Sequence, residues 1–219
     1  MKLIKELVAG LFIGIGGTIF LAIENKIIGA LFFSFALLSV LNFGSILYTG
    51  RIGYFFSYDK NEKLALLHVL LFNCIGTCII ALIVFLMWNK TINIRVLEVD
   101  KAKFTLEWYQ ILFRSIMCGV MMVIAVEGFK RFDNFLMKNL IVILSIAIFV
   151  ISGFEHSVAN MFYYFLGLFN GFNFNYVHVL LLLLTVLGNS IGSILFYFLL
   201  QLCDKVKEKK TYENEVKSE

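Results

Sequence analysis

A series of long apolar runs is the feature that most constrains how this chain can fold. A helix needs roughly 20 mostly apolar residues to cross the hydrocarbon core of a bilayer. Sixty per cent of the 219 residues are hydrophobic and the mean hydropathy is +0.88, whereas a soluble domain is closer to half apolar. The sequence therefore predicts an all-α integral membrane protein with six transmembrane helices. The predicted spans are residues 7–23, 27–49, 64–88, 106–126, 139–169 and 174–203.

The distribution of basic residues predicts the orientation of these spans. With both termini on one side, the segments on that side contain 12 Lys and Arg residues, and the loops on the other side contain five. Basic loops favour the cytoplasmic side. We therefore expect a multi-pass protein of the cytoplasmic (inner) membrane with both termini in the cytoplasm. The polar tail 204–219 is typical of a segment beside anionic lipid, and no basic soluble domain indicates a nucleic-acid partner.

The chain contains an internal repeat. "FNCIGTCII" in the third run and "LGNSIGSILF" in the sixth share the pattern Asn-x-Ile-Gly-small, which gives Asn73 and Asn189 matching positions. The second and fifth runs each contain a polar interruption, "ILYTGRIGYF" and "SGFEHSVAN". Three spans that occur twice must run in opposite directions, as in many transporters. We expect one aquaporin-like channel domain, 1–203, with two inverted three-helix repeats (7–88 and 106–203) and broken helices 2 and 5.

The stretch "SGFEHSVANMF" places a histidine at membrane depth, where titratable groups are costly and usually functional. Burial disfavours the charged imidazole, so we expect His156 to be neutral and to donate a hydrogen bond to an anion. A lone buried histidine is more often structural. The break at Gly153 and the matching break at Thr49 favour a place in a permeation pathway. His68 and His178 fit no cluster.

Metal or cofactor binding is not expected. The four cysteines lie inside or at the end of apolar runs, and Cys74 and Cys78 are one helical turn apart. Without further ligands at a suitable spacing, they are interpreted as small core residues.

These motifs resemble the formate/nitrite transporter family of pentameric anion channels. "GFEHSVANMF" is similar to the signature of that family's fifth helix, and "LYTG" (47–50) to the break in its second helix. The resemblance covers about residues 7–203. It implies a homopentamer in membrane lipid with one pore per protomer. It also implies proton-linked passage of formate, nitrite, hydrosulfide or short carboxylates.

The resemblance implies roles for individual residues. His156 matches the central histidine, Thr49 the threonine of the break, and Lys138 the lysine that opens the fifth helix. From their polarity, we expect Glu155, Asn160, Asn73 and Asn189 to support the broken backbone. The residues that match the apolar constrictions are Phe33, Leu37, Leu47, Tyr48, Met122 and Phe149.

Three positions depart from the family pattern, and one of them is Phe165, which stands where a Pro often follows the fifth-helix motif. Gly119 stands where the family usually has Asn, and Arg51 is unusual directly after Thr49 and Gly50. Loss of a polar side chain at position 119 favours a wider pore, which tilts the expected substrate toward hydrosulfide or a broader set of anions.

The apolar constrictions favour a weak acid as the permeating species, because a bare anion is costly to desolvate. Two alternatives remain. A membrane subunit that handles haem or a vitamin would need paired histidines on facing helices. An intramembrane enzyme would need a nucleophile–base or metal motif such as His-Glu-x-x-His, and the three histidines here lie in different runs. We expect a channel or transporter rather than an enzyme.

Overall fold

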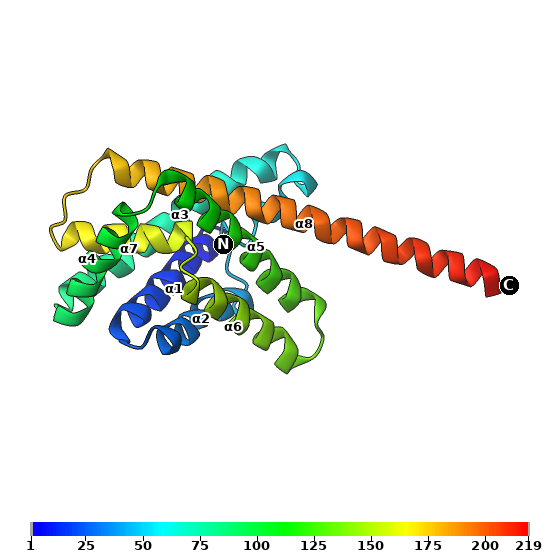
Figure 1. The fold of residues 1–219 in the computed structure, drawn as a ribbon, viewed down its shortest axis with the longest axis horizontal. Helices are drawn as coiled ribbons and strands as arrows, with labels where there is room; N and C mark the ends of the chain where they lie inside the picture. Colours follow the sequence, from blue (N-terminus) through cyan, green and yellow to red (C-terminus); the bar gives the residue numbers. More distant parts are fainter. Residues whose placement is uncertain (1, 219) are drawn as a thin grey trace.

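The computed structural model describes residues 2–218, with side chains as far as residue 206, and its regular elements in this range are helices. The last helix extends beyond the others toward the C-terminus (Figure 1). In chain order the elements are α1 (Lys2–Ala22), α2 (Lys26–Asn42), the 3-10 helix η1 (Ile52–Ser57), α3 (Lys60–Leu86), α4 (Lys90–Phe104), α5 (Trp108–Arg131), α6 (Phe135–Ile151), α7 (Ser157–Phe169) and α8 (Tyr176–Ser218).

Among the residues that the structure describes, four helices are long and apolar enough to cross a bilayer: α1, α3, α5 and residues Tyr176–Val206 of α8. The other predicted spans are not single helices. The run 27–49 is helical as α2 and leaves the helix after Asn42, and the run 139–169 contains α6 and α7 with a non-helical segment between them. Helix α4 lies between the third and fourth predicted spans, in a segment that we expected to be a loop.

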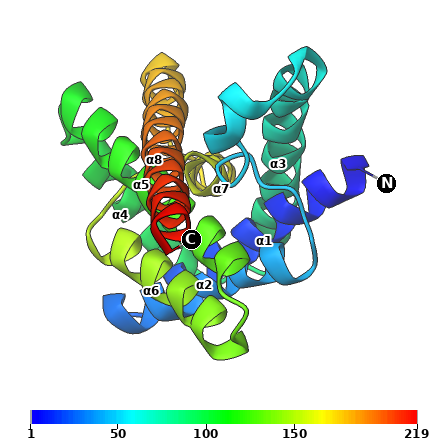
Figure 2. The same cartoon turned by 90° about the vertical axis from the view of Figure 1, so that its right-hand side faces the viewer.

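Helix α7 lies near the middle of the bundle when the molecule is viewed along α8 (Figure 2). It packs on α3 and contacts α4, while α1 packs on α3, α2 on α6 and α5 on α8. Helix α4 forms because Asn89 caps it, accepting a hydrogen bond from the Ile92 amide at 3.2 Å, and because Lys101 and Lys103 occupy the last turn, where the helix dipole favours cations.

Helices α2 and α6 end in the same way. Gly44 has a φ of 62° and Gly153 a φ of 69°, a left-handed conformation that costs glycine little because it has no Cβ atom. In both cases the amide of the next residue donates to the carbonyl five residues back, at 2.9 Å from Ser45 and 3.0 Å from Phe154. This Schellman arrangement turns the chain out of the helix and exposes main-chain groups that need partners.

Asn73 on α3 supplies those partners after α2. Its Oδ1 atom accepts a hydrogen bond from the Tyr48 amide at 2.8 Å. Its Nδ2 atom donates to the carbonyls of Ile46 at 3.0 Å and Glu6 at 2.7 Å. One buried side chain therefore joins α3, the broken segment and α1.

Asn189 on α8 makes the same set of bonds after α6. Its Oδ1 atom accepts from the Ser157 amide at 2.8 Å, and its Nδ2 atom donates to the carbonyls of Glu155 at 2.8 Å and Ser115 at 2.9 Å. These three main-chain partners each lie 109 positions after their counterparts around Asn73, as Ser157 does after Tyr48. The two halves of the chain thus use one hydrogen-bonding scheme.

Replacing Asn189 with Ala should strongly destabilise the protein, because one buried amide and two buried carbonyls lose their partner. Each unpaired group costs about 1–3 kcal/mol, so the free energy of unfolding should fall by roughly 3 kcal/mol or more. Thermal unfolding in detergent measures the change. Asn42→Ala is the control, because Asn42 is exposed and donates to Leu38 within its own helix. Equal melting temperatures for the two variants would contradict this assignment.

Candidate functional site

His156 links the two broken segments. It is the N-cap of α7, and its Nδ1 atom accepts a hydrogen bond from the Ala159 amide at 3.1 Å. Because Nδ1 accepts, the ring proton lies on Nε2, which is 3.0 Å from Thr49 Oγ1. The ring is buried. Protonation would place a second N–H against the Ala159 amide, so both burial and this bond favour the neutral imidazole.

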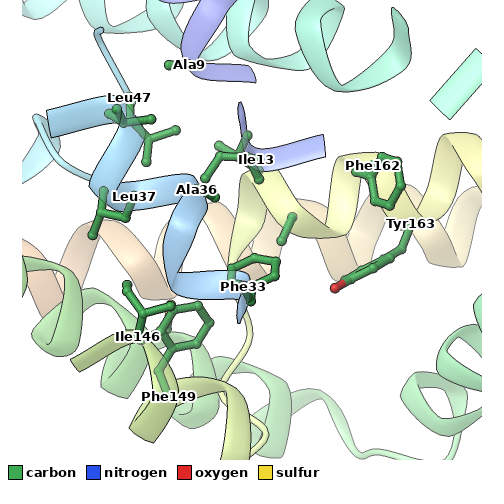
Figure 3. Close-up of a cluster of buried hydrophobic side chains, with 14 of the residues drawn as sticks. Ala9, Ile13, Phe33, Ala36, Leu37, Leu47, Ile146, Phe149, Phe162 and Tyr163 are labelled. Atoms are coloured by element: carbon green, nitrogen blue, oxygen red, sulfur yellow. The ribbon is translucent and has the colours of Figure 1, made fainter. Parts of the chain in front are cut away.

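Apolar side chains form a layer beside His156. The Phe149 ring stacks on the imidazole with centroids 5.9 Å apart, and Phe33 meets Phe149 edge-on at 6.0 Å. Figure 3 shows Phe33 beside Phe149, with Leu37 further along the Phe33 helix. The buried cluster that contains this layer also includes Leu37, Leu47 and Met122.

Two cavities flank this layer. One, of about 240 Å³, is lined by Phe33, Phe149 and His156, and we call it the His156 cavity. The other, of about 290 Å³, is lined by Leu37 and Leu47 among others, and we call it the Arg51 cavity. Members of one buried apolar cluster contribute to both linings. Basic side chains line each cavity: Lys26, Lys103 and Arg114 the first, Arg51 and Lys130 the second.

Glu155 is the centre of a buried charged group beside His156. Its Oε2 atom forms an ion pair with Lys103 and accepts a hydrogen bond from Asn160 Nδ2 at 2.8 Å. Lys103 and Glu155 are 8% and 6% exposed, and buried charges are stable only when they are paired in this way. From the sequence we expected Glu155 to support the broken backbone. Its carboxylate instead binds the side chains of Lys103 and Asn160.

Residues 2–203 match the family model described as Formate/nitrite transporter. The chain belongs to this family. The formate channel FocA of Haemophilus influenzae is 29% identical over 150 residues, which are 63% of this chain and 52% of FocA, so the match spans about half of that relative.

Two solved structures have the same fold as this formate/nitrite transporter family member. A protein described as an FNT family ion channel matches 93% of this chain and 89% of its own, with a TM-score of 0.82. A pentameric formate channel with formate bound matches 94% and 96%, with a TM-score of 0.78. Both are 22% identical to this chain. The family match and the apolar helices together identify this chain as a multi-pass membrane protein.

The sequence reasoning missed Lys103 in this family member, because residues 90–104 looked like a loop. The signal was present in the spacing. Ile92, Val96 and Lys103 are the buried residues of α4, and their spacing of four and seven places them on one helical face. A lysine on the buried face of an amphipathic helix requires a buried partner, which here is Glu155.

Two predicted pore residues lie elsewhere. The ammonium group of Lys138 lies 5.1 Å from the centre of the Phe129 ring, and Lys138 does not line the His156 or the Arg51 cavity. Tyr48 packs in a second buried cluster with Ile46, and its hydroxyl is 3.0 Å from Ser190 Oγ. It is separate from the apolar layer because adjacent residues of an extended segment point in opposite directions.

Gly119 lies at a helix crossing, so the interpretation that it widens the pore is wrong. A Cβ atom at this position would lie 2.8 Å from the Ser193 amide nitrogen and 3.0 Å from the Asn189 carbonyl carbon, both in α8. The main chains of α5 and α8 approach each other here, and a side chain would force them apart.

Gly119→Ala should therefore act on stability through the α5–α8 contact. Overpacking typically costs about 1–3 kcal/mol, and we expect a lower melting temperature in detergent. The ratio of nitrite to formate flux in liposomes should stay close to that of the parent. Gly50→Ala is the control for thermal stability, because a Cβ atom there would lie 3.5 Å from Val126 Cγ2, an ordinary van der Waals distance. A changed anion ratio with unchanged stability would restore a pore role for position 119.

Proposed function

We propose that this protein is a channel for small monovalent anions and their weak acids: formate, nitrite, hydrosulfide or short carboxylates. The observation that carries the proposal is the buried hydrogen bond between His156 and Thr49, beside an apolar layer and at the end of a cavity with basic side chains. Family membership supports transport over enzymatic activity and over haem or vitamin handling.

In this proposal, cations collect the anion and His156 helps it across the apolar layer. Lys26 and Arg114 make the His156 cavity favourable for a negative charge, since the charge of Lys103 is paired with Glu155, which lines the same cavity. The anion replaces Thr49 as the acceptor of the His156 Nε2–H group. The layer of Phe33 and Phe149 is costly for a bare anion, so the anion crosses with one proton as the neutral acid and no net charge moves.

Family membership and the matched breaks support the proposed arrangement. The shared hydrogen bonds of Asn73 and Asn189 support two inverted repeats, 7–88 and 106–203, in one domain, 1–203. With both termini in the cytoplasm, as the distribution of basic residues favours, the His156 cavity opens to the outside and the Arg51 cavity to the cytoplasm. The tail 204–219 then lies in the cytoplasm, and the protein lies in the cytoplasmic membrane. We further propose a homopentamer with one pore per protomer, because a channel of the same fold is pentameric and large apolar side chains are exposed on α3, including Leu67 and Leu71.

His156→Phe should abolish flux while the protein still assembles, because the ring volume is kept and the N–H donor is lost. His156→Asn should keep some anion passage and lose only the part of the pH dependence that comes from His156, because an amide donates a hydrogen bond but does not titrate near neutral pH, whereas the supply of neutral acid still varies with pH. A liposome panel of formate, nitrite and hydrosulfide at two pH values measures both effects.

His68→Phe is the control for this experiment, since His68 is an exposed histidine on α3. Native mass spectrometry of each variant checks assembly. If His156→Phe transports all three anions as the parent does at both pH values, the histidine is structural and the proposed pathway is wrong.

Charge at the cytoplasmic mouth should affect anion affinity. We propose that Arg51, which lines the Arg51 cavity, and Lys138 both attract anions to this mouth. Arg51→Gln should raise the half-saturating concentration for formate several-fold, and Lys138→Gln should raise it less. Maximal flux should change little. Both effects should shrink at high ionic strength, because salt screens exposed charges. Effects of equal size at low and high salt would exclude an electrostatic origin.

A further inference from the structure

The third residue of α8, His178, lies in an enclosure that the pathway does not use. The sequence indicated no cluster for this histidine, yet it is 2% exposed. Four aromatic rings lie around it, with centroids between 4.6 and 5.4 Å from the imidazole, and the planes of two of them are nearly parallel to it. The rings are those of Phe172 and Phe174 (stacked), Phe104 and Tyr164.

Polar partners orient this imidazole between α4 and α8. Its Nδ1 atom accepts a hydrogen bond from the Asn175 amide at 3.1 Å, so the proton of the neutral ring lies on Nε2. Nε2 is 3.3 Å from Asp100 Oδ1 on α4. The His178–Asp100 contact therefore joins the start of α8 to the helix that carries Lys103.

Three residues of helix α4 make polar contacts with the bundle. Arg95 donates to the carbonyls of Leu21, at 2.8 Å, and Ile23 at the end of α1. Asp100 contacts His178, and Lys103 pairs with Glu155. Asp100 and Lys103 are three residues apart and so lie on one face of the helix. A contact that restrains Asp100 should therefore also restrain the position of Lys103 beside Glu155.

We propose that His178 and Asp100 form a proton-dependent clasp that positions α4, and through it Lys103, at the mouth of the His156 cavity. His178 and Asp100 are positioning residues, and the transport effect of the clasp rests on the proposed function. The clasp is strongest when His178 is protonated and Asp100 is ionised.

The surroundings of His178 explain this dependence. A protonated ring gains the attraction of the Asp100 carboxylate and of the stacked aromatic faces. The new Nδ1–H group can donate to Asn175 Oδ1, which is 3.2 Å away. Opposing this, burial disfavours the charge, Lys103 adds a like charge near Asp100, and protonation of Nδ1 ends the hydrogen bond that this atom accepts from the Asn175 amide. Tyr164, the remaining titratable group in contact with the ring, is a neutral phenol at these pH values.

The clasp should have a lower as well as an upper pH limit. Burial raises the pKa of the Asp100 carboxyl, and the charges of His178 and Lys103 oppose that rise. On strong acidification Asp100 therefore becomes neutral and the charge pairing is lost. The clasp should therefore be weaker when the imidazole is neutral and also when the carboxylate is neutral.

Hydrogen exchange of residues 90–104 tests the clasp without requiring transport. The purified protein in detergent is compared at about pH 5.5 and about pH 7.5, a range in which imidazole changes charge, after correction for intrinsic exchange rates. The parent should show several-fold greater protection of α4 at the lower pH. His178→Phe keeps a ring in the enclosure and should lose this difference, while His68→Phe should retain it.

A second variant and a second readout separate the clasp from simple packing. Asp100→Asn should lose the pH difference in the same way. In liposomes, His178→Phe should flatten the pH profile of the half-saturating formate concentration, and it should have no further effect in a Lys103→Met background.

Three results would overturn the proposal. The first is a His178→Phe variant whose α4 protection still differs between the two pH values as in the parent. The second is a His178→Phe variant that loses the same amount of α4 protection at both pH values. The third is additive effects of His178→Phe and Lys103→Met on the pH profile of the half-saturating formate concentration. A parent protein that transports none of the tested anions would refute the proposed function, while hydrogen exchange would still decide whether the clasp exists.

Discussion

The architecture depends on the need to satisfy main-chain hydrogen-bonding groups where a helix stops inside an apolar bundle. Such groups have no water to bind, and leaving them unpaired is costly. Asn73 and Asn189 each supply one acceptor and two donors at these points, with bonds of 2.7 to 3.0 Å. This arrangement allows the chain to leave the helix at Gly44 and Gly153, and so allows Thr49 and His156 to meet.

The second constraint is that charge at this depth must be paired. Lys103 and Glu155 line the same cavity as the apolar layer. Asn160 donates a further hydrogen bond to the paired carboxylate. The imidazole of His156 stays neutral because its Nδ1 atom already accepts the Ala159 amide. A cavity bordered by a paired cation, a neutral N–H donor and aromatic rings favours an anion at its entrance and a neutral molecule at its end.

The sequence was informative where a local pattern carries the meaning. Apolar runs identified a membrane protein, and the interruptions at residues 47–51 and 152–160 follow the ends of α2 at Asn42 and α6 at Ile151. The repeated Asn-x-Ile-Gly pattern identified the two asparagines that bind the broken segments. It was less informative where meaning depends on which face of a helix is buried. The missing side chain at Gly119 was interpreted as extra space in the pore. In the structure this position faces the main chain of α8.

By itself, the sequence determined the membrane-spanning character, the helix interruptions and the position of His156 within one of them. Hydrophobicity, glycine conformation and polar residues at membrane depth act locally along the chain, so a reader of the sequence can recognise them. Tertiary structure decided that Lys103 pairs with Glu155, 52 residues away, and that His178 lies among four aromatic rings facing Asp100. Those contacts join helices whose relative placement follows from packing across the whole bundle, and no local pattern encodes which side chains packing brings together.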